Sequence, residues 1–162
     1  MTEHRTVIGI DPGLDGAIAV MDGIGSPVVY DMPTVRLEKS GGGHRRDYEL
    51  KELWLKIILG PFDLMVIERL QPMPSDKRGM IGAFSIGRSL GILEGMATAL
   101  GKPFIRVLPT VWKRRYGLLG QGKQASRVRA MERFPTVDLS KKKHDGRADA
   151  LWLALYGMEV ER

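Results

Sequence analysis

The sequence predicts an α/β fold: a five-stranded mixed sheet, made of an antiparallel three-strand meander plus two parallel strands, flanked by helices. Three short apolar runs near the N-terminus are joined by turns rich in Gly and Asp, a pattern typical of a meander. Two later apolar runs alternate with longer helical segments, which favours parallel pairing. Since neither an internal repeat nor a linker interrupts residues 1–162, we expect a single domain.

The individual elements follow from the same patterns. Strands are expected at residues 6–11, 17–21 and 28–30 for the meander and at residues 63–68 and 104–108 for the parallel pair. Helices are expected over residues 47–59, from the end of a proline-rich loop at 71–79 to about residue 100, briefly after Pro109, and over residues 123–134 and 145–158. Asp47 is the expected N-cap of the first helix. Residues 36–46 contain three successive glycines among basic residues, and we expect them to form a flexible loop.

Charge and composition limit the classes of function. The net charge is +6 and the pI is about 9.7, which favours a polyanionic partner over a merely soluble basic protein. The absence of cysteine excludes disulfides and thiolate metal sites. No run of 18 apolar residues and no signal-peptide pattern occurs in the sequence, so we expect a cytoplasmic protein without a membrane partner.

Four acidic residues stand at the ends of predicted elements. Asp11 and Glu68 end apolar strands, and Asp145 and Asp149 lie one turn apart at the start of the last helix. Carboxylates are rarely buried unless they are paired or bound to a cation, and oxygen-only ligands favour Mg²⁺ or Mn²⁺ over zinc. We therefore expect a divalent metal site, where two ions could activate water and stabilise the leaving oxygen of a phosphodiester. Taken singly, Asp11 could instead be a turn residue, Asp145 a helix N-cap and Asp149 a solvated side chain.

Three blocks of the sequence resemble, in order and spacing, the signature blocks of RuvC-type Holliday junction resolvases: Ile8–Gly13, Val66–Glu68 and Asp145–Leu151. Two further segments, Gly87–Gly91 and Pro109–Lys113, extend the resemblance over nearly the whole chain. The resemblance is closest to the phage-type branch of that family.

The resemblance implies an RNase H-like fold and the activity of a Mg²⁺-dependent crossover junction endodeoxyribonuclease. It implies that two Mg²⁺ ions, or Mn²⁺ in their place, are held by four acids: Asp11, Glu68, Asp145 and Asp149. It also implies a homodimer that binds branched DNA, four-way junctions above all, in a bacterial or phage-infected cell.

Two positions depart from the family pattern. Bacterial members carry an aspartate or histidine three residues before the last acid, where this chain has Gly146. Either Asp145 or His144 could complete the site, and Asp145 is favoured because one helical turn returns it to the face of Asp149. Many members place an aromatic residue where this chain has Gln71. Phe84 is a candidate for the residue that wedges into a junction, but a place in the core is the favoured interpretation of it.

Basic residues cluster at element boundaries near the expected metal site. The candidates for contacts with DNA phosphates are Arg69, Lys77, Arg78, Lys113, Arg114, Arg115, Lys123, Lys143 and Arg147. The alternative for each is an ordinary solvated side chain, which is the common role of residues in a lysine run such as 141–143.

Glycines carry two further predictions. Gly87, Gly91 and Gly95 recur on one stripe of the long helix, where they permit either close packing on the protein's own sheet or the seam of a homodimer. The resemblance favours the dimer. Gly117–Gln124 nearly matches a nucleotide-binding P-loop but has Gln124 where Ser or Thr must hold Mg²⁺, so we expect no nucleotide cofactor. A loop that offers backbone N–H groups and Lys123 to DNA phosphate is the expected alternative.

Three other functions remain open from the sequence. An RNase H-like nuclease could act on RNA–DNA hybrids or RNA, and a non-catalytic module could bind junctions without cutting them. An actin-like or sugar-kinase ATPase would need two domains of this type, and the chain supplies one.

Overall fold

The central sheet contains five strands in the order β3-β2-β1-β6-β7, within the residues that the computed structural model describes: 5–58, 60–71, 79–122 and 124–160. The antiparallel meander consists of β1 (Val7–Asp11), β2 (Ala17–Met21) and β3 (Val28–Asp31). Two parallel strands, β6 (Leu64–Glu68) and β7 (Phe104–Val107), continue the sheet from β1. The predicted five-stranded mixed sheet is confirmed.

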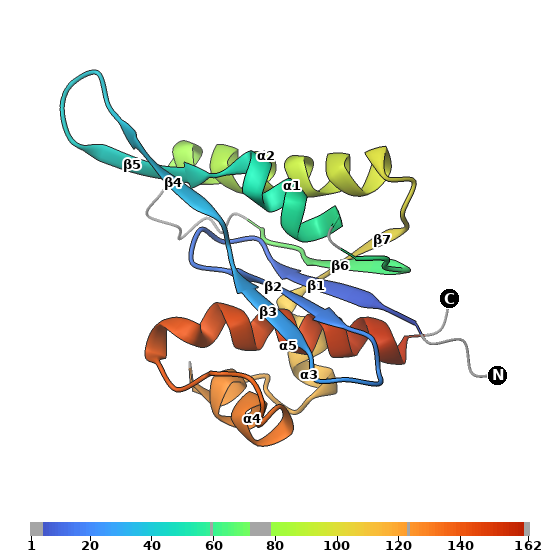
Figure 1. The fold of residues 1–162 in the computed structure, drawn as a ribbon. Coiled ribbons are helices and arrows are strands. Elements are labelled where there is room, and N and C mark those ends of the chain that lie inside the picture. The colour runs from blue at the N-terminus through green and yellow to red at the C-terminus, as the bar shows by residue number, and fades with distance from the viewer. Residues whose placement is uncertain (1–4, 59, 72–78, 123, 161–162) are drawn as a thin grey trace.

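Helices cover both faces of the sheet (Figure 1). One face carries α5 (Asp145–Glu159), with α3 (Pro109–Arg115) and α4 (Ala125–Arg133) outside it, and the other carries α1 (Leu50–Ile58) and α2 (Gly79–Ala99). This arrangement explains why β1 and β6 are apolar at successive positions, because alternate side chains enter cores on opposite faces. Val7 packs in the core beneath α5, for example, whereas Ile8 packs in the core beneath α1 and α2.

Close packing of α5 on β1 depends on Gly9. A β-carbon at Gly9 would lie 2.3 Å from the carbonyl oxygen of Ala150 and 2.3 Å from the amide nitrogen of Ala154. Only glycine lets the helix backbone approach the strand this closely. The crossing brings the first turns of α5, which carry Asp145 and Asp149, to the end of β1.

Residues 36–46 form a β-hairpin, so the prediction of a flexible loop is wrong. Strand β4 (Thr34–Glu38) pairs antiparallel with β5 (His44–Tyr48) in a separate two-stranded sheet. The turn at the tip is closed, because the Lys39 N–H donates to the Gly43 carbonyl at 3.0 Å and the Gly42 N–H to the Lys39 carbonyl at 2.9 Å. Gly42 and Gly43 have positive φ angles of 86° and 82°, which explains the glycines there. We call this hairpin, residues 34–48, the basic ribbon.

Asp47 lies in β5, so its predicted role as the N-cap of a helix is also wrong. Helix α1 begins at Leu50, and the Glu49 carboxylate accepts a 2.5 Å hydrogen bond from the Glu52 N–H in the place of a cap. The helices otherwise lie close to their predicted positions. Within the described residues, no helix is long and apolar enough to cross a lipid bilayer.

The glycine stripe of α2 faces away from the sheet. Gly87, Gly91 and Gly95 are exposed, and a β-carbon at any of them would have no neighbouring atom within 4 Å. The alternative that these glycines pack on the protein's own sheet is therefore wrong. Phe84 is 73% exposed, so the expectation that it belongs to the core is wrong.

Candidate active site

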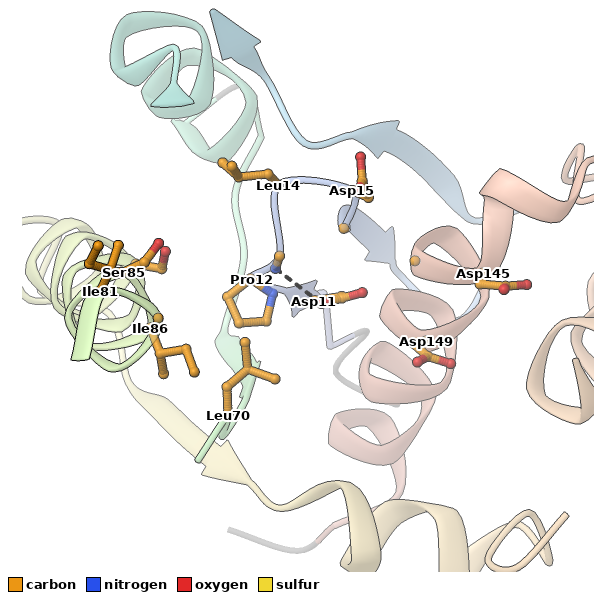
Figure 2. A pocket seen from close by; sticks show the side chains of 15 residues that line it. Asp11, Pro12, Leu14, Asp15, Leu70, Ile81, Ser85, Ile86, Asp145 and Asp149 are labelled. Atoms are coloured by element: carbon orange, nitrogen blue, oxygen red, sulfur yellow. Dashed lines mark hydrogen bonds between the residues drawn. The ribbon is translucent and has the colours of Figure 1, made fainter. Parts of the chain in front are cut away.

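Asp11 and Glu68 meet at one edge of the sheet because their strands are parallel neighbours. The register pairs Ile10 with Ile67, so each acid follows directly at the end of its strand. Glu68 is buried, with 6% of its surface exposed. The Asp11 carboxylate points toward α5, on which Asp149 faces the same space (Figure 2). The structure thus brings together three of the four predicted acids.

The pKa values of these three carboxylates reflect their burial and their proximity to one another. Burial and, to a smaller extent, the Asp149 charge together raise the pKa of Asp11 to about 6. Burial likewise raises the pKa of Glu68 to about 7, with contributions from Asp11 and Asp149. Burial also raises the pKa of Asp149. The positive charge of the nearby Lys113 ammonium lowers the pKa of each of the three acids and so partly offsets these increases.

Each of the three carboxylates is oriented by one donor. Asp11 Oδ1 accepts from the Gly13 N–H at 3.1 Å, which is the Asx-type contact expected of an aspartate in a turn. Glu68 Oε1 accepts from the indole N–H of the buried Trp112 at 3.0 Å. Asp149 Oδ1 accepts from the Ser126 hydroxyl at 2.5 Å. In every case the hydrogen bond uses one oxygen and leaves the second free of a protein donor among the described residues.

Asp145 lines the same cleft but its carboxylate is turned away from Asp11 (Figure 2). Its Oδ1 accepts from Arg127 Nε at 3.1 Å, and the nearly buried Arg127 guanidinium also donates to the Leu139 carbonyl at 3.0 Å. His144 is buried in the short 3₁₀ helix Lys142–His144, where its Nδ1 accepts from the Lys141 N–H at 3.4 Å. Of the two residues that could complete the site, Asp145 lines the cleft and His144 does not.

Gly146 is the position where the family resemblance expects an acid or histidine, and the structure explains the glycine. A β-carbon there would lie 2.4 Å from the carbonyl oxygen of Asp15 and 2.8 Å from the Cα of Gly16. The turn that follows β1 therefore packs directly on the first turn of α5. A side chain at this position would push the turn, and Asp11 with it, away from Asp149.

A cleft of about 620 Å³ opens beside the acids. Its lining combines the turn after β1, the N-terminal half of α2 and the start of α5, including Asp11, Asp15, Ser85, Ser89, Asp145 and Asp149. Figure 2 shows Ile81, Ser85 and Ile86 of α2 on the side opposite Asp145 and Asp149. The cleft is therefore acidic on its α5 side, and its α2 side combines isoleucine side chains with the hydroxyls of Ser85 and Ser89.

The chemistry of this donor set fits a hard divalent cation. All the candidate donors are carboxylate oxygens, and their mutual repulsion and burial disfavour the ionised forms unless positive charge is supplied. With the side chains in their present rotamers, no group of three or more His, Asp or Glu residues in the described ranges is arranged to hold a metal ion. Metal binding here stays a prediction.

Three of the predicted phosphate-binding cations are exposed near the candidate site and one lies among the acids. Arg69 directly follows Glu68, Arg114 lies on α3, and Lys143 directly precedes His144 and Asp145. Lys113 is half-buried beside the three carboxylates. Lys77, Arg78 and Lys123 lie outside the described residues.

Two other predicted cations are already engaged within the protein. Both outer nitrogens and Nε of Arg147 donate hydrogen bonds, two of them to the Asp31 carboxylate at 2.5 and 2.9 Å and one to the Asp138 carbonyl at 3.1 Å. Arg115 pairs with Glu159 at 2.8 Å, at the far end of α5 from the acids. DNA binding by Arg115 and Arg147 therefore stays a prediction without structural support.

Sequence reasoning missed the residues that orient the acids. Trp112 lies in a block that the resemblance includes, but an apolar residue in such a block gives no sign that its N–H binds Glu68. Ser126 and Arg127, adjacent on α4, hold Asp149 and Asp145, and the Ser126 carbonyl in turn accepts from the Trp152 indole at 3.0 Å. No sequence pattern pairs α4 with α5 in this way, because the contacts depend on tertiary packing.

Asp11→Asn is expected to stabilise the metal-free protein by about 2 to 3 kcal/mol at pH 7.5 and by clearly less at pH 4.5. Folding raises the pKa of Asp11 from 3.8 to about 6, so the folded state binds this proton more tightly than the unfolded state. The ionised Asp11 carboxylate therefore lowers the free energy of unfolding by its full amount above about pH 6 and has no such effect below pH 3.8. Urea unfolding in chelator at both pH values measures it. A destabilised variant at pH 7.5, or an equal gain at both pH values, would contradict the expectation.

Comparison with known proteins identifies the fold. No protein-family model and no curated protein matches the sequence. Among solved structures, Thermus thermophilus RuvC in complex with a Holliday junction substrate matches with a TM-score of 0.61 and 16% sequence identity, over 94% of this chain and 91% of that chain. A second Thermus thermophilus RuvC structure matches with a TM-score of 0.59 and 18% identity, over 93% of this chain and 92% of that chain. The match spans both chains almost completely. This chain therefore has the RNase H-like fold of RuvC.

Proposed function

We propose that this protein is a structure-selective endodeoxyribonuclease that resolves four-way DNA junctions by Mg²⁺-dependent hydrolysis of phosphodiester bonds. The observation that carries the proposal is the convergence of Asp11, Glu68 and Asp149 at the edge of a RuvC-type sheet, beside an open cleft. The fold alone allows many functions, so the site must supply the argument. The similar RuvC structure was solved with a Holliday junction substrate, which supports four-way junctions as the substrate.

Asp11, Glu68 and Asp149 would hold the cations through the carboxylate oxygens that carry no hydrogen bond from the protein. Asp145 would join them after its carboxylate turns from Arg127 into the cleft. Two bound Mg²⁺ ions would supply activation of water and charge stabilisation at the leaving oxygen. Trp112 and Ser126 hold Glu68 and Asp149 in place, so these acids need little reorganisation when a substrate binds.

Lys113 is suited to stabilise negative charge on the scissile phosphate. Its ammonium is close enough to Asp11, Glu68 and Asp149 to lower the pKa of each. Arg69, Arg114 and Lys143 are exposed around the same edge of the sheet and would contact phosphates on either side of the cut. Phosphate contacts read backbone shape rather than sequence, which suits selection of a branch point.

A homodimer is part of this proposal, because symmetric resolution of a junction requires matched cuts in two strands. The exposed face of α2 supports it. Met80 and Phe84, which are 88% and 73% exposed, share that face with the glycine stripe of Gly87, Gly91 and Gly95. An apolar helix face that continues into a row of glycines is suited to close packing against a second copy of itself.

A panel of substrates tests the proposed activity. A synthetic four-way junction, a matched linear duplex and an RNA–DNA hybrid would each be incubated with Mg²⁺, Mn²⁺ or chelator. Cleavage of the junction at paired positions, at least about tenfold faster than of the other substrates and abolished by chelator, is expected. Faster cleavage of the hybrid would favour an RNase H-like nuclease acting on RNA. Tight junction binding without cutting under any metal condition would favour a non-catalytic module.

A further inference from the structure

The basic ribbon is the part of the structure that the proposed activity does not yet use. It extends beyond the body of the protein at the end of the sheet where the acids lie, next to the N-terminal half of α2 (Figure 1). Four cationic side chains lie along it, Arg36, Lys39, Arg45 and Arg46, against two acidic ones, Glu38 and Asp47. All four cationic residues are exposed. The ribbon is thus a projecting, positively charged surface.

Its base is fixed to the turn that carries Asp11. The Arg46 guanidinium pairs with Asp15 at 2.6 Å and donates to the Leu14 carbonyl at 2.5 Å. The Tyr48 hydroxyl donates to the Pro12 carbonyl from a buried position. Every residue of that turn that these contacts reach also lines the cleft. The ribbon therefore begins at the rim of the candidate active site.

A second contact holds the ribbon against α2. Asp47 Oδ1 accepts from Arg88 at 2.5 Å, and Asp47 Oδ2 pairs with Arg45 at 3.3 Å. Together with the closed turn at the tip, these contacts give the ribbon a defined direction relative to the cleft. Such pre-ordering lowers the conformational entropy that a binding surface loses when its ligand arrives.

Two of the four cations of the ribbon, Arg36 and Lys39, have no anionic partner among the described residues. Arg36 lies directly opposite Arg46 in the ribbon register, and like charges at such positions repel. Arg46 is compensated by Asp15, but the side chains of Arg36 and Lys39 form no hydrogen bond or ion pair with any residue in the described parts of the chain. Two unpaired, exposed cations on a projecting surface are suited to contact the phosphates of DNA.

We propose that the basic ribbon is a DNA-binding arm that lies along one duplex arm of the junction and contacts its phosphates through Arg36 and Lys39. This inference rests on the proposed function, because it takes the branched DNA as the ligand. A two-stranded ribbon fits the major groove of B-DNA. Strands of this length span about 17 Å, so the arm reaches about five base pairs from the cleft. Its attachment to Pro12, Leu14 and Asp15 lets the bound duplex arm set the position of the strand that enters the site.

The test is the salt dependence of junction binding by a matched pair of double variants. Arg36→Ala/Lys39→Ala removes two charges from the ribbon, and Lys102→Ala/Arg133→Ala removes two charges from positions away from the cleft. Dissociation constants for a labelled four-way junction are measured in chelator between 50 and 200 mM salt. The ribbon variant is expected to bind about tenfold more weakly, with a slope of log K against log salt reduced by about 2. The control variant is expected to match the wild type.

Two further measurements sharpen the result. Arg36→Lys/Lys39→Arg keeps both charges and is expected to show the wild-type slope of log K against log salt. If these residues had only a structural role, the slope would not depend on their charge. At subsaturating junction the ribbon variant is expected to cleave about tenfold more slowly than the wild type, in proportion to its weaker binding. If the wild type binds and cuts the junction but the ribbon variant has the slope of the control, the ribbon proposal is overturned and the proposed function is not. If the wild type does not bind the junction, both are overturned.

Discussion

Asp11→Asn is expected to lower the rate of junction cleavage by about 10³-fold or more while junction binding in chelator remains at the wild-type level. Asp11 ends β1 and shares the edge of the sheet with Glu68, and burial and the Asp149 charge raise its pKa to about 6. Replacement of its carboxylate by an amide removes a charge that a divalent cation would neutralise. The remaining acids would then hold that cation less tightly, and in a different position. Single-turnover cleavage with Mg²⁺ measures the effect.

Glu132→Gln is the matched control for this variant. Glu132 is an exposed acid of α4, so the same change from carboxylate to amide there is expected to leave the cleavage rate unchanged. If urea unfolding shows that Asp11→Asn is at least as stable as the wild type at pH 7.5, a loss of activity by this variant does not come from unfolding. Wild-type turnover by Asp11→Asn would exclude the proposed mechanism.

Gly9→Ala is expected to destabilise the fold by about 3 kcal/mol or more, because the added methyl group meets the backbone of α5. The contacts of 2.3 Å to Ala150 O and Ala154 N involve main-chain atoms, which cannot move aside as a flexible side chain could. For a protein of this size, such a loss corresponds to a fall in Tm of about 6 to 12 °C. Thermal unfolding monitored by circular dichroism measures it.

Gly60→Ala is the control for Gly9→Ala. A β-carbon at Gly60 would meet no atom within 4 Å, so this variant is expected to unfold at the wild-type temperature within a few degrees. Gly9→Ala is also expected to lose cleavage activity below its Tm, because a displaced α5 separates Asp149 from Asp11. A variant with wild-type stability would mean that β1 and α5 are farther apart than the structure has them.

The positions of Asp11 and Glu68 could be predicted because a continuous apolar run shows where a buried strand ends. Val7–Asp11 and Leu64–Glu68 are continuous apolar runs that end in an acid, and parallel pairing brings such ends to one edge. Asp149 precedes an apolar stretch in α5 that has to be buried. The mixed sheet, its strand limits and the meeting of Asp11, Glu68 and Asp149 all followed from these local patterns.

The hairpin could not be predicted in the same way, because its sequence lacks the usual signs of a strand. Residues 44–47 are His, Arg, Arg and Asp, which are rarely found in a buried sheet, and three glycines separate them from β4. The ribbon is held by contacts made far along the chain, from Arg46 to Leu14 and Asp15 and from Asp47 to Arg88. Local propensity contains no information about such partners.

Long-range partners also account for the differences at the candidate site. Arg147 was predicted to contact DNA but pairs with Asp31, 116 positions away in the chain. Asp145 was predicted to share one face of α5 with Asp149. Instead, Arg127 of the neighbouring helix α4 binds the Asp145 carboxylate and turns it away from the other acids. Helical spacing places two acids on one face of a helix but does not fix the rotamer that a neighbouring cation selects.

Binding of Mn²⁺ to the protein–junction complex is the most direct test of the central claim, which is that Asp11, Glu68 and Asp149 form a cation site. Calorimetric titration would use a junction made resistant to cleavage, so that binding is measured apart from turnover. We expect two Mn²⁺ ions per protein chain with the wild type and at most one with Glu68→Gln. Uptake of no Mn²⁺ by the wild-type complex, or equal uptake by Glu68→Gln, would contradict the claim.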